Sequence, residues 1–228
     1  NGDFPYEAGK VYNSELTFIN GAADGYGTAD IFDNDVMSEA WDQSDNKGST
    51  KDTPYLIESA GHLKYLIEQV KAGEAYLDKF FKLTTDIKVT ADTWMPIGIS
   101  YAKPFSGNFD GGGHTISGEL KGSFSDDLEN PEGTIISPFG VGGVIGNGPT
   151  TKITVHNCTM SGEMKISDGN LAYGYLCIGG IIGHSGAHMN NCSSIGKSDV
   201  SCKGNSLWIG GIIGRDGLLQ SEYKHCIN

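Results

Sequence analysis

A six-residue pattern occurs three times in this sequence and strongly restricts how the chain can fold. It reads VGGVIG at 141–146, IGGIIG at 178–183 and IGGIIG at 209–214. The pattern is neither a hairpin turn nor a phosphate-binding loop. Glycine beside bulky aliphatic residues permits a sharp bend and the close approach of a neighbouring layer of backbone. The three copies therefore indicate repeated units that stack on one another.

A second landmark recurs with the same mean spacing. The segments VHNCTM, MNNCSS and YKHCIN place Cys158, Cys192 and Cys226 at intervals of 34 residues. The glycine pattern recurs at intervals of 37 and 31 residues. Two landmarks with one mean period indicate a repeat with loops of variable length, which is typical of solenoids, propellers and arrays.

The repeat unit has the length of one coil of a parallel β-solenoid. It contains no helical pattern, and a propeller blade needs four antiparallel strands in about 40 residues or more. A unit of this size accommodates three short strands and three turns. Stacked coils place like residues above like residues, about 4.8 Å apart. The sequence predicts a mostly β chain with ladders formed by Cys158, Cys192, Cys226, Gly142, Gly143, Gly179, Gly180, Gly210 and Gly211.

The five cysteines favour buried free thiols. Cβ atoms stacked about 5 Å apart lie outside the usual disulfide range. A disulfide that involves Cys177 or Cys202 remains an alternative. The chain has no CxxC motif, so we expect no zinc site of that type and no cofactor.

One helix and two regions are expected along the chain. Ser59 suits an N-cap, apolar residues follow at helical spacing, and Gly73 suits a C-cap, so the sequence predicts a helix at about 59–73. Residues 1–50 read as an acidic lead-in with some β structure, and residues 51–228 as the β domain, with repeats at about 135–228. Alternation changes phase near Asn157, which predicts a corner or a bulge there.

The net charge of the chain limits the classes of partner that we expect it to bind. The chain carries a formal charge of −12 and a single arginine, Arg215. Nucleic acid and anionic membrane both attract a basic face, so neither is expected as the main partner. No stretch approaches the roughly 20 apolar residues of a membrane span.

Several clusters invite a chemical interpretation, and each has a structural alternative that we favour. The acidic residues Asp24, Asp30, Asp33, Asp35 and Glu39 suit calcium but lack EF-hand spacing. Asp110 and His114 flank three glycines, which favours a turn over a catalytic pair. His184, His188 and His225 match no zinc spacing, so we expect no metal site.

Polysaccharide-cleaving β-helices need grouped carboxylates on one face. The candidates are Asp126, Asp127, Glu129, Glu132, Glu163 and Asp168, and the sequence shows none of them recurring at equivalent positions on neighbouring coils. Aromatic rings that stack on sugars are a second possibility, carried by Trp94, Tyr101, Phe105, Tyr173, Tyr175 and Trp208. Among all of these residues, Tyr173, Tyr175, Asp126 and Asp127 are the candidates for ligand contact.

The order of landmarks over residues 48–228 resembles the GLUG-repeat surface proteins of Bacteroides-type bacteria. The resemblance rests on GSTKDTPYLIESAGHLKYLIEQVKAG, FFKLTTDIKV, WMPIG, PFSGNFDGGGHTISG and the xGGxIG units. GLUG repeats also occur in immunoglobulin-A-cleaving metallopeptidases, outside their catalytic part, and the zinc motif HExxH of those enzymes is absent here. The resemblance implies a right-handed parallel β-helix whose first coil is capped by the helix, with Trp94 and Phe105 in the core.

The expected function follows from this resemblance. It is that of an exported, non-catalytic protein of the outer cell surface, which binds a glycan, a host protein or a bacterial protein in an adhesin-like role. A lipid anchor in a longer form of the protein is compatible with this expectation, and so is another element packed beyond the third cysteine. The alternative is a carbohydrate-active enzyme or a glycan-capture protein of the same surface.

Overall fold

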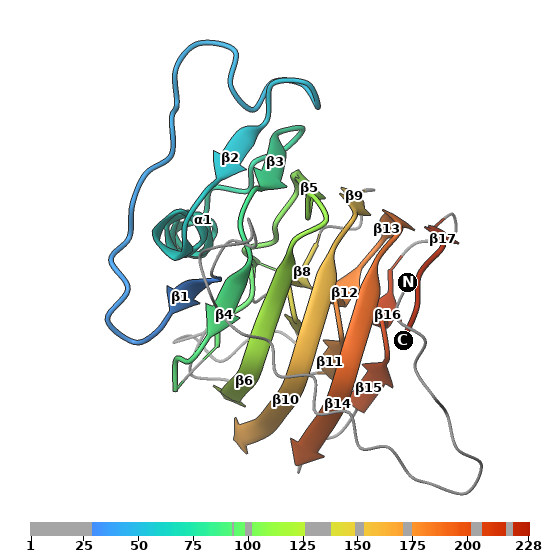
Figure 1. Ribbon diagram of the computed structural model, residues 1–228. Helices are drawn as coiled ribbons and strands as arrows, with labels where there is room; N and C mark the ends of the chain where they lie inside the picture. The colour runs from blue at the N-terminus through green and yellow to red at the C-terminus, as the bar shows by residue number, and fades with distance from the viewer. Residues whose placement is uncertain are drawn as a thin grey trace, which may run out of the picture.

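The chain is mostly β, and all the pairings between its described strands are parallel. The computed structural model describes residues 29–92, 94–98, 102–125, 138–148, 153–170, 175–201, 207–217 and 221–228. The strands form four sheets, and successive strands of each sheet lie side by side along the molecule (Figure 1). This arrangement is compatible with a parallel β-helix.

Sheet 1 has the order β1-β4-β6-β10-β14, and its strands are β1 (Asp30–Phe32), β4 (Ile87–Val89), β6 (Thr115–Ser125), β10 (Thr159–Asn170) and β14 (Ser193–Ser201). Sheet 2 comprises β7 (Pro138–Gly142), β11 (Tyr175–Gly179) and β15 (Leu207–Gly210). Sheet 3 comprises β8 (Ile145–Asn147), β12 (Ile182–Ser185) and β16 (Ile213–Asp216). Sheet 4 comprises β2 (Tyr55–Ile57), β3 (Phe80–Leu83), β5 (Asn108–Asp110), β9 (Ile153–His156), β13 (Ala187–Asn190) and β17 (Glu222–Lys224).

From β9 onward, consecutive strands along the chain belong to sheets 4, 1, 2 and 3 in that order. We call each such set of four consecutive strands a rung. Each rung supplies four strands, so the expectation of three strands per repeat was wrong. The physical reason is the glycine pair. It separates the end of β11 at Gly179 from the start of β12 at Ile182, so the aliphatic run contributes two strands to each rung.

The glycine pair lies where the backbones of neighbouring rungs meet. Val141, Ile178 and Ile209 share one register across sheet 2, and Ile145, Ile182 and Ile213 share another across sheet 3. A Cβ atom on Gly180 would collide with the carbonyl oxygen of Gly211 and with the side chain of Ser194 across the interior. Only glycine fits this position, because one obstructing atom is a backbone oxygen and the other two belong to the buried side chain of Ser194.

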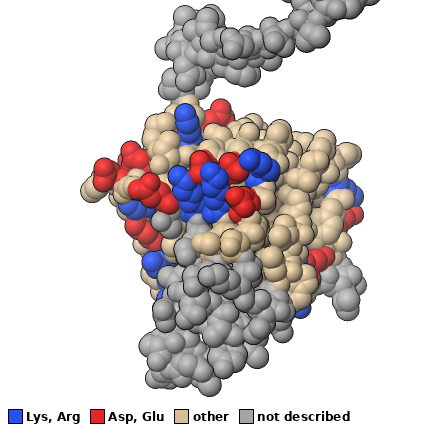
Figure 2. Space-filling view, turned by 90° about the horizontal axis from the view of Figure 1, so that it is seen from below, with Lys and Arg blue, Asp and Glu red and all other residues tan. Residues whose placement is uncertain are grey.

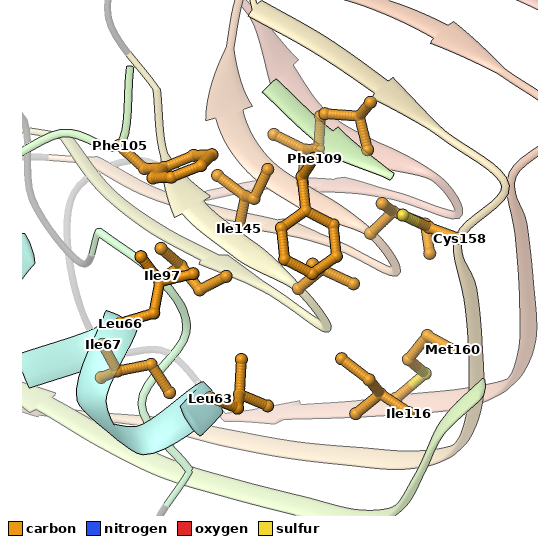
Figure 3. Close-up of a cluster of buried hydrophobic side chains, with 14 of the residues drawn as sticks. Leu63, Leu66, Ile67, Ile97, Phe105, Phe109, Ile116, Ile145, Cys158 and Met160 are labelled. Atoms are coloured by element: carbon orange, nitrogen blue, oxygen red, sulfur yellow. The ribbon is translucent and has the colours of Figure 1, made fainter. Parts of the chain in front are cut away.

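Helix α1 runs from Ala60 to Ala72 and has both of the cap residues singled out from the sequence. The Ser59 hydroxyl accepts a hydrogen bond from the backbone N–H of His62 at 3.0 Å, and Gly73 adopts the left-handed conformation with φ 112°. The helix contacts β1 and β2, the first strands of sheets 1 and 4 (Figure 1). Its apolar residues Leu63 and Leu66 are fully buried in the core (Figure 3).

The core is a single apolar cluster that extends from the helix into the space between the sheets. Figure 3 shows Ile97 next to Leu66 and Ile67 of the helix, and Cys158 and Met160 on the far side of the cluster. Trp94 and Phe105 are buried, as predicted. The predicted corner is also present, because Asn157 has a positive φ of 53° between β9 and β10.

Residues 29–50, part of the segment expected to be a lead-in, pack into this same core. Phe32 lies in β1, and the buried ring of Trp41 contacts Tyr55, Tyr65, Tyr76 and Phe81 with ring centroids 4.9–5.9 Å apart. The lead-in and the helix therefore share one set of apolar contacts.

We predict that Gly180→Ala lowers the free energy of unfolding by about 3 kcal/mol, because the added Cβ has no space between rungs. The matched control is Gly73→Ala. Gly73 has a positive φ but no neighbour within 4 Å of an added Cβ, so its loss is expected to be about 1 kcal/mol. Urea unfolding followed by circular dichroism measures both, and equal losses would contradict the packing argument.

We predict that Trp41→Ala lowers the free energy of unfolding by about 3–5 kcal/mol, as expected for a deleted core aromatic ring. The control is Met37→Ala in the same segment. Met37 is 80% exposed, and its loss is expected to stay within about 0.5 kcal/mol. If thermal unfolding of the two variants were indistinguishable, Trp41 would not anchor this segment.

Candidate binding surface

The outer face of sheet 1 carries charged side chains that stack across three strands. Glu119, Glu163 and Lys197 occupy one register in β6, β10 and β14. Two residues farther along, Lys121, Lys165 and Asp199 occupy the next outward register. Since side chains alternate along a strand, these positions face outward while Leu120 and Met164 are buried. We call these six charged residues the charge ladder.

Ion pairs join the three strands of the charge ladder. Lys165 Nζ lies 2.8 Å from Glu119 Oε1 and 3.5 Å from Glu163 Oε2. Lys197 Nζ lies 2.8 Å from Glu163 Oε1, and Lys121 Nζ lies 3.3 Å from Glu119 Oε1. Figure 2 shows lysine and acidic side chains gathered next to one another on one face of the molecule. The ladder is therefore a mixed, mutually neutralised surface.

The ion pairs also fix the protonation states of this surface. A hydrogen bond from Lys165 lowers the pKa of Glu119, and a hydrogen bond from Lys197 lowers the pKa of Glu163. The same contacts raise the pKa values of Lys165 and Lys197. Both carboxyl groups are thus charged at neutral pH. A general acid for glycoside cleavage requires the opposite shift, a raised pKa.

The expectation that no carboxylate recurs on neighbouring coils was wrong for one of the six candidates. Glu163 pairs in register with Glu119 of the preceding strand. The sequence concealed this pair because the two residues are 44 positions apart, whereas the cysteines recur every 34. The residues most useful for the surface, Glu119, Lys121, Lys165 and Lys197, were not singled out. The signal for Glu119, Lys121 and Lys165 is the recurrence of SGE in SGELK and SGEMK, which does not extend to Lys197.

Polar residues also stack at the corner between sheets 4 and 1. Asp110 Oδ1 accepts hydrogen bonds from the backbone N–H of Gly112 at 2.8 Å and from Asn157 Nδ2 at 3.0 Å. Asn191 Nδ2 in turn donates to Asn157 Oδ1 at 3.0 Å. His114 instead lies 3.3 Å from Asp86. Asp110 and its glycines therefore form a turn rather than a catalytic pair with His114.

The three histidines considered for a metal site have three different partners. His184 is buried beside Asn147 at 3.2 Å, and burial lowers its pKa. His188 Nδ1 lies 3.4 Å from Glu222, and His225 Nδ1 lies 3.2 Å from Asn190 Oδ1. Within the described residues, no group of three histidine, cysteine or acidic side chains is placed to hold a metal ion.

The cysteine landmarks occupy equivalent positions on successive rungs. Cys158 and Cys192 each precede one residue of the register pair Thr159 and Ser193, and Cys226 precedes Ile227, which bridges to Ser193. The cysteines that the structure describes are all free thiols. A hydrogen bond to Cys192 and complete burial raise the pKa of Cys158. Buried thiols of this kind pack as small apolar groups.

Two acidic residues of the lead-in, Asp30 and Asp33, bind backbone groups. Asp30 Oδ2 accepts a hydrogen bond from the N–H of Ala60 at 2.6 Å, at the start of α1. Asp33 Oδ1 accepts one from the N–H of Asp35 at 3.0 Å. Asp24 lies outside the described residues. These contacts suit a helix start and a turn.

The residues predicted for ligand contact fall largely outside the described part of the chain. Asp126, Asp127 and Tyr173 are not described, and Tyr175 is described only as the first backbone position of β11. The strand ends that precede them do pair, since Ser125 at the end of β6 aligns with Asn170 at the end of β10. These candidates therefore stay predictions.

Comparison with known proteins gives one informative similarity. The chain is 31% identical over 150 residues to a protein of Evansella cellulosilytica described as "Putative Gly-rich membrane protein". The match covers 63% of this chain and 15% of that relative, so the chain spans a small part of the relative's length. No family model and no solved structure matches the chain. Among the described residues, no helix is long and apolar enough to cross a membrane.

We predict that Lys165→Met raises the pKa values of both Glu119 and Glu163 toward their ordinary value, because Lys165 contacts both carboxyl groups. Lys121→Met is the matched control and is expected to move only Glu119. The folded-state pKa values are depressed, so the ladder stabilises the fold at neutral pH and loses this effect as the pH falls through them. NMR titration of the side-chain carboxyl carbons measures each shift, and an unmoved Glu163 in Lys165→Met would contradict the geometry.

Proposed function

We propose that this chain is a non-catalytic binding module, built as a right-handed parallel β-helix of the GLUG-repeat type. The single observation that carries the proposal is the charge ladder, which continues without interruption across β6, β10 and β14 on the outer face of sheet 1. Helix α1 would cap the first rung through its contacts with β1 and β2. The recurrence of xGGxIG at equivalent registers supports the GLUG assignment.

The chemistry of the charge ladder favours binding over turnover. The carboxyl groups of Glu119 and Glu163 have lowered pKa values and are held by lysines at 2.8 Å, which suits hydrogen bonding to hydroxyl or amide groups of a partner. An acid–base pair for glycoside cleavage needs one carboxyl that stays protonated near neutral pH. The alternative function, a carbohydrate-active enzyme, would have to place such a group elsewhere, for example at Asp126 or Asp127.

We place the module at the outer cell surface, where it would bind a glycan, a host protein or a neighbouring bacterial protein. Similarity to a protein named as a Gly-rich membrane protein supports a location at the cell envelope. A face with equal numbers of lysine and acidic residues suits a neutral, hydroxyl-rich ligand such as a glycan better than a strongly charged polymer. Tyr173 and Tyr175 are proposed to contribute stacking contacts to the same ligand.

The proposal is tested with a glycan array and a parallel turnover assay on polysaccharides that bind. We predict binding without turnover, and a loss of about tenfold in affinity for Lys165→Met, which removes two ionic contacts from the face. Lys51→Met, at a described lysine on another face, is the matched control and is expected to bind like the parent. Hydrolysis or eliminative cleavage of any bound glycan would overturn the assignment as a non-catalytic protein.

The residues proposed for ligand contact allow a second readout from the same assay. Tyr173→Ala and the pair Asp126→Asn with Asp127→Asn are each expected to weaken binding severalfold without changing thermal stability. An enzyme that uses these aspartates would instead lose turnover while it retains binding. The two functions therefore predict different patterns for the same variants.

A further inference from the structure

A small hollow lies at the surface of sheet 4, where strands β3, β5 and β9 run side by side. Its volume is about 30 Å³, and its lining includes Lys51, Pro54, Phe80, Lys82, Asp110 and His156. A buried water needs about 10–15 Å³, so the hollow holds roughly two or three of them. It is therefore large enough for a small polar group of a ligand, such as a carboxylate. We call it the sheet 4 hollow.

Three outward positions of sheet 4 form one side of the hollow. Lys82 of β3 pairs in register with Asp110 of β5, and Asp110 pairs with His156 of β9. The residue that precedes each of them along its strand is buried in the core. Because side chains alternate along a strand, the three polar residues face outward together.

The segment that carries Lys51 and Pro54 is tied to this sheet by backbone hydrogen bonds. Gly48 N–H donates to the carbonyl of Thr53 at 2.6 Å, and Phe80 N–H donates to the carbonyl of Gly48 at 3.0 Å. These bonds hold Lys51 beside the strands. Pro54 and the half-buried ring of Phe80 add an apolar wall to the hollow.

The charged groups of the hollow favour an anion. Lys51 and Lys82 form no ion pair with any residue that the structure describes. Asp110 is the acidic residue of the lining, and its Oδ1 already accepts hydrogen bonds from the N–H of Gly112 and from Asn157 Nδ2. The chain has a net charge of −12, but salt screens charges beyond about 8 Å, so the local groups decide which ion binds. Two ammonium groups therefore face one carboxylate that is already hydrogen-bonded.

His156 adds a third donor, because its neighbours determine which ring nitrogen carries the proton. Asn191 Nδ2 donates to Asn157 Oδ1, which orients the Asn157 amide so that its Nδ2 lies 2.9 Å from His156 Nδ1. An amide nitrogen is a donor, so in the neutral ring Nδ1 accepts and Nε2 carries the proton. In the protonated ring, Nδ1 donates to Asp110 Oδ1 at 3.3 Å and Nε2 still carries a proton. The Nε2–H group of His156 is thus a donor in both states.

We propose that the sheet 4 hollow binds the carboxylate of an acidic sugar, such as a uronic acid residue of a polysaccharide. Lys51 and Lys82 neutralise the carboxylate, and His156 Nε2–H donates a hydrogen bond to it. The apolar C–H face of the sugar ring lies against Phe80 and Pro54. This apolar wall favours a ring over the flexible carboxylate of an acidic peptide. The site lies on sheet 4, so it is separate from the charge ladder on sheet 1 and from the function proposed for that ladder.

The probe is methyl glucuronide, and methyl glucoside is its matched control because it has a hydroxymethyl group in place of the carboxylate. Acetate is the second control, since it supplies a carboxylate without a ring. NMR shifts of the backbone amides of Phe80, Lys82 and His156 measure binding to the unmodified protein. We expect the glucuronide to bind about tenfold more tightly than either control. Equal binding of the glucuronide and either control, or no shift at these amides at tens of millimolar, would overturn the proposal.

Substitution of the lysines provides the second test. Lys51→Met and Lys82→Met are each expected to weaken glucuronide binding about tenfold, while Lys71→Met on α1 leaves it unchanged. Glucuronide affinity that stays at the parent value in both variants, or that falls equally in Lys71→Met, would contradict the site. Lys165→Met on the charge ladder is expected to bind glucuronide like the parent. Because the ligand of the ladder is proposed to be neutral and Lys51 lies outside the ladder, either site can fail its test without deciding the other.

Discussion

Contact between glycine backbones of successive rungs is the constraint on which the rest of the structure depends. Gly143 N–H donates to the carbonyl of Gly180 at 3.1 Å, and Gly180 N–H donates to that of Gly211 at 3.0 Å. The interior side chains of sheet 1 pack directly against these glycines, since an added Cβ on Gly143 would meet Met160. The glycine column therefore brings sheets 2 and 3 into direct contact with the interior side chains of sheet 1. The same column fixes the register in which the charge ladder stacks.

The corner between sheets 4 and 1 is the second fixed point of each rung. Asn157, Asn191 and His225 all have positive φ angles, between 50° and 54°, and each is followed by a cysteine of the ladder. Asparagine tolerates this conformation better than most residues, and its side chain bridges to the next rung. Because this connection is so short, it gives β9 and β10 the same relative orientation as β13 and β14. Longer connections, such as those from β10 to β11 and from β16 to β17, accommodate the differences among rungs.

Much of this architecture was predictable from the sequence, and the failures have physical causes. The helix caps at Ser59 and Gly73 and the corner at Asn157 follow from local rules of conformation, whereas the burial of Trp94 and Phe105 was expected from the family resemblance. The four-strand rung was missed because a glycine pair inside an aliphatic run looks the same in a strand and in a bend. The interval of 34 residues between cysteines is the same in both repeats only because two differences in segment length cancel. Cys158 to Ile178 spans 20 residues and Cys192 to Ile209 only 17, while the distance from the glycine pattern to the next cysteine grows from 14 to 17.

The candidate surface was less predictable than the fold, because it depends on register rather than on local pattern. Glu119 and Glu163 meet only because the chain between them makes one longer circuit, and no periodicity in the sequence reveals that length. Trp41 was hidden in the same way, since nothing in its acidic neighbourhood indicates a ring that reaches Tyr65 and Phe81. The Glu119–Glu163 pair and the burial of Trp41 both depend on contacts between distant parts of the chain, and such contacts are difficult to predict from a single sequence.

Charge balance on the ladder shapes how a partner approaches it. The chain carries a net charge of −12, yet the ladder holds three lysines and three acidic residues, so the excess negative charge lies elsewhere. A balanced face exerts little long-range attraction, and it acts mainly within hydrogen-bond distance. Under the binding function proposed above, recognition there would depend on the spacing of alternating donors and acceptors along the rungs. A ligand with its own regular repeat of hydroxyl groups fits such a face better than an irregular one, because several contacts then form in the same register.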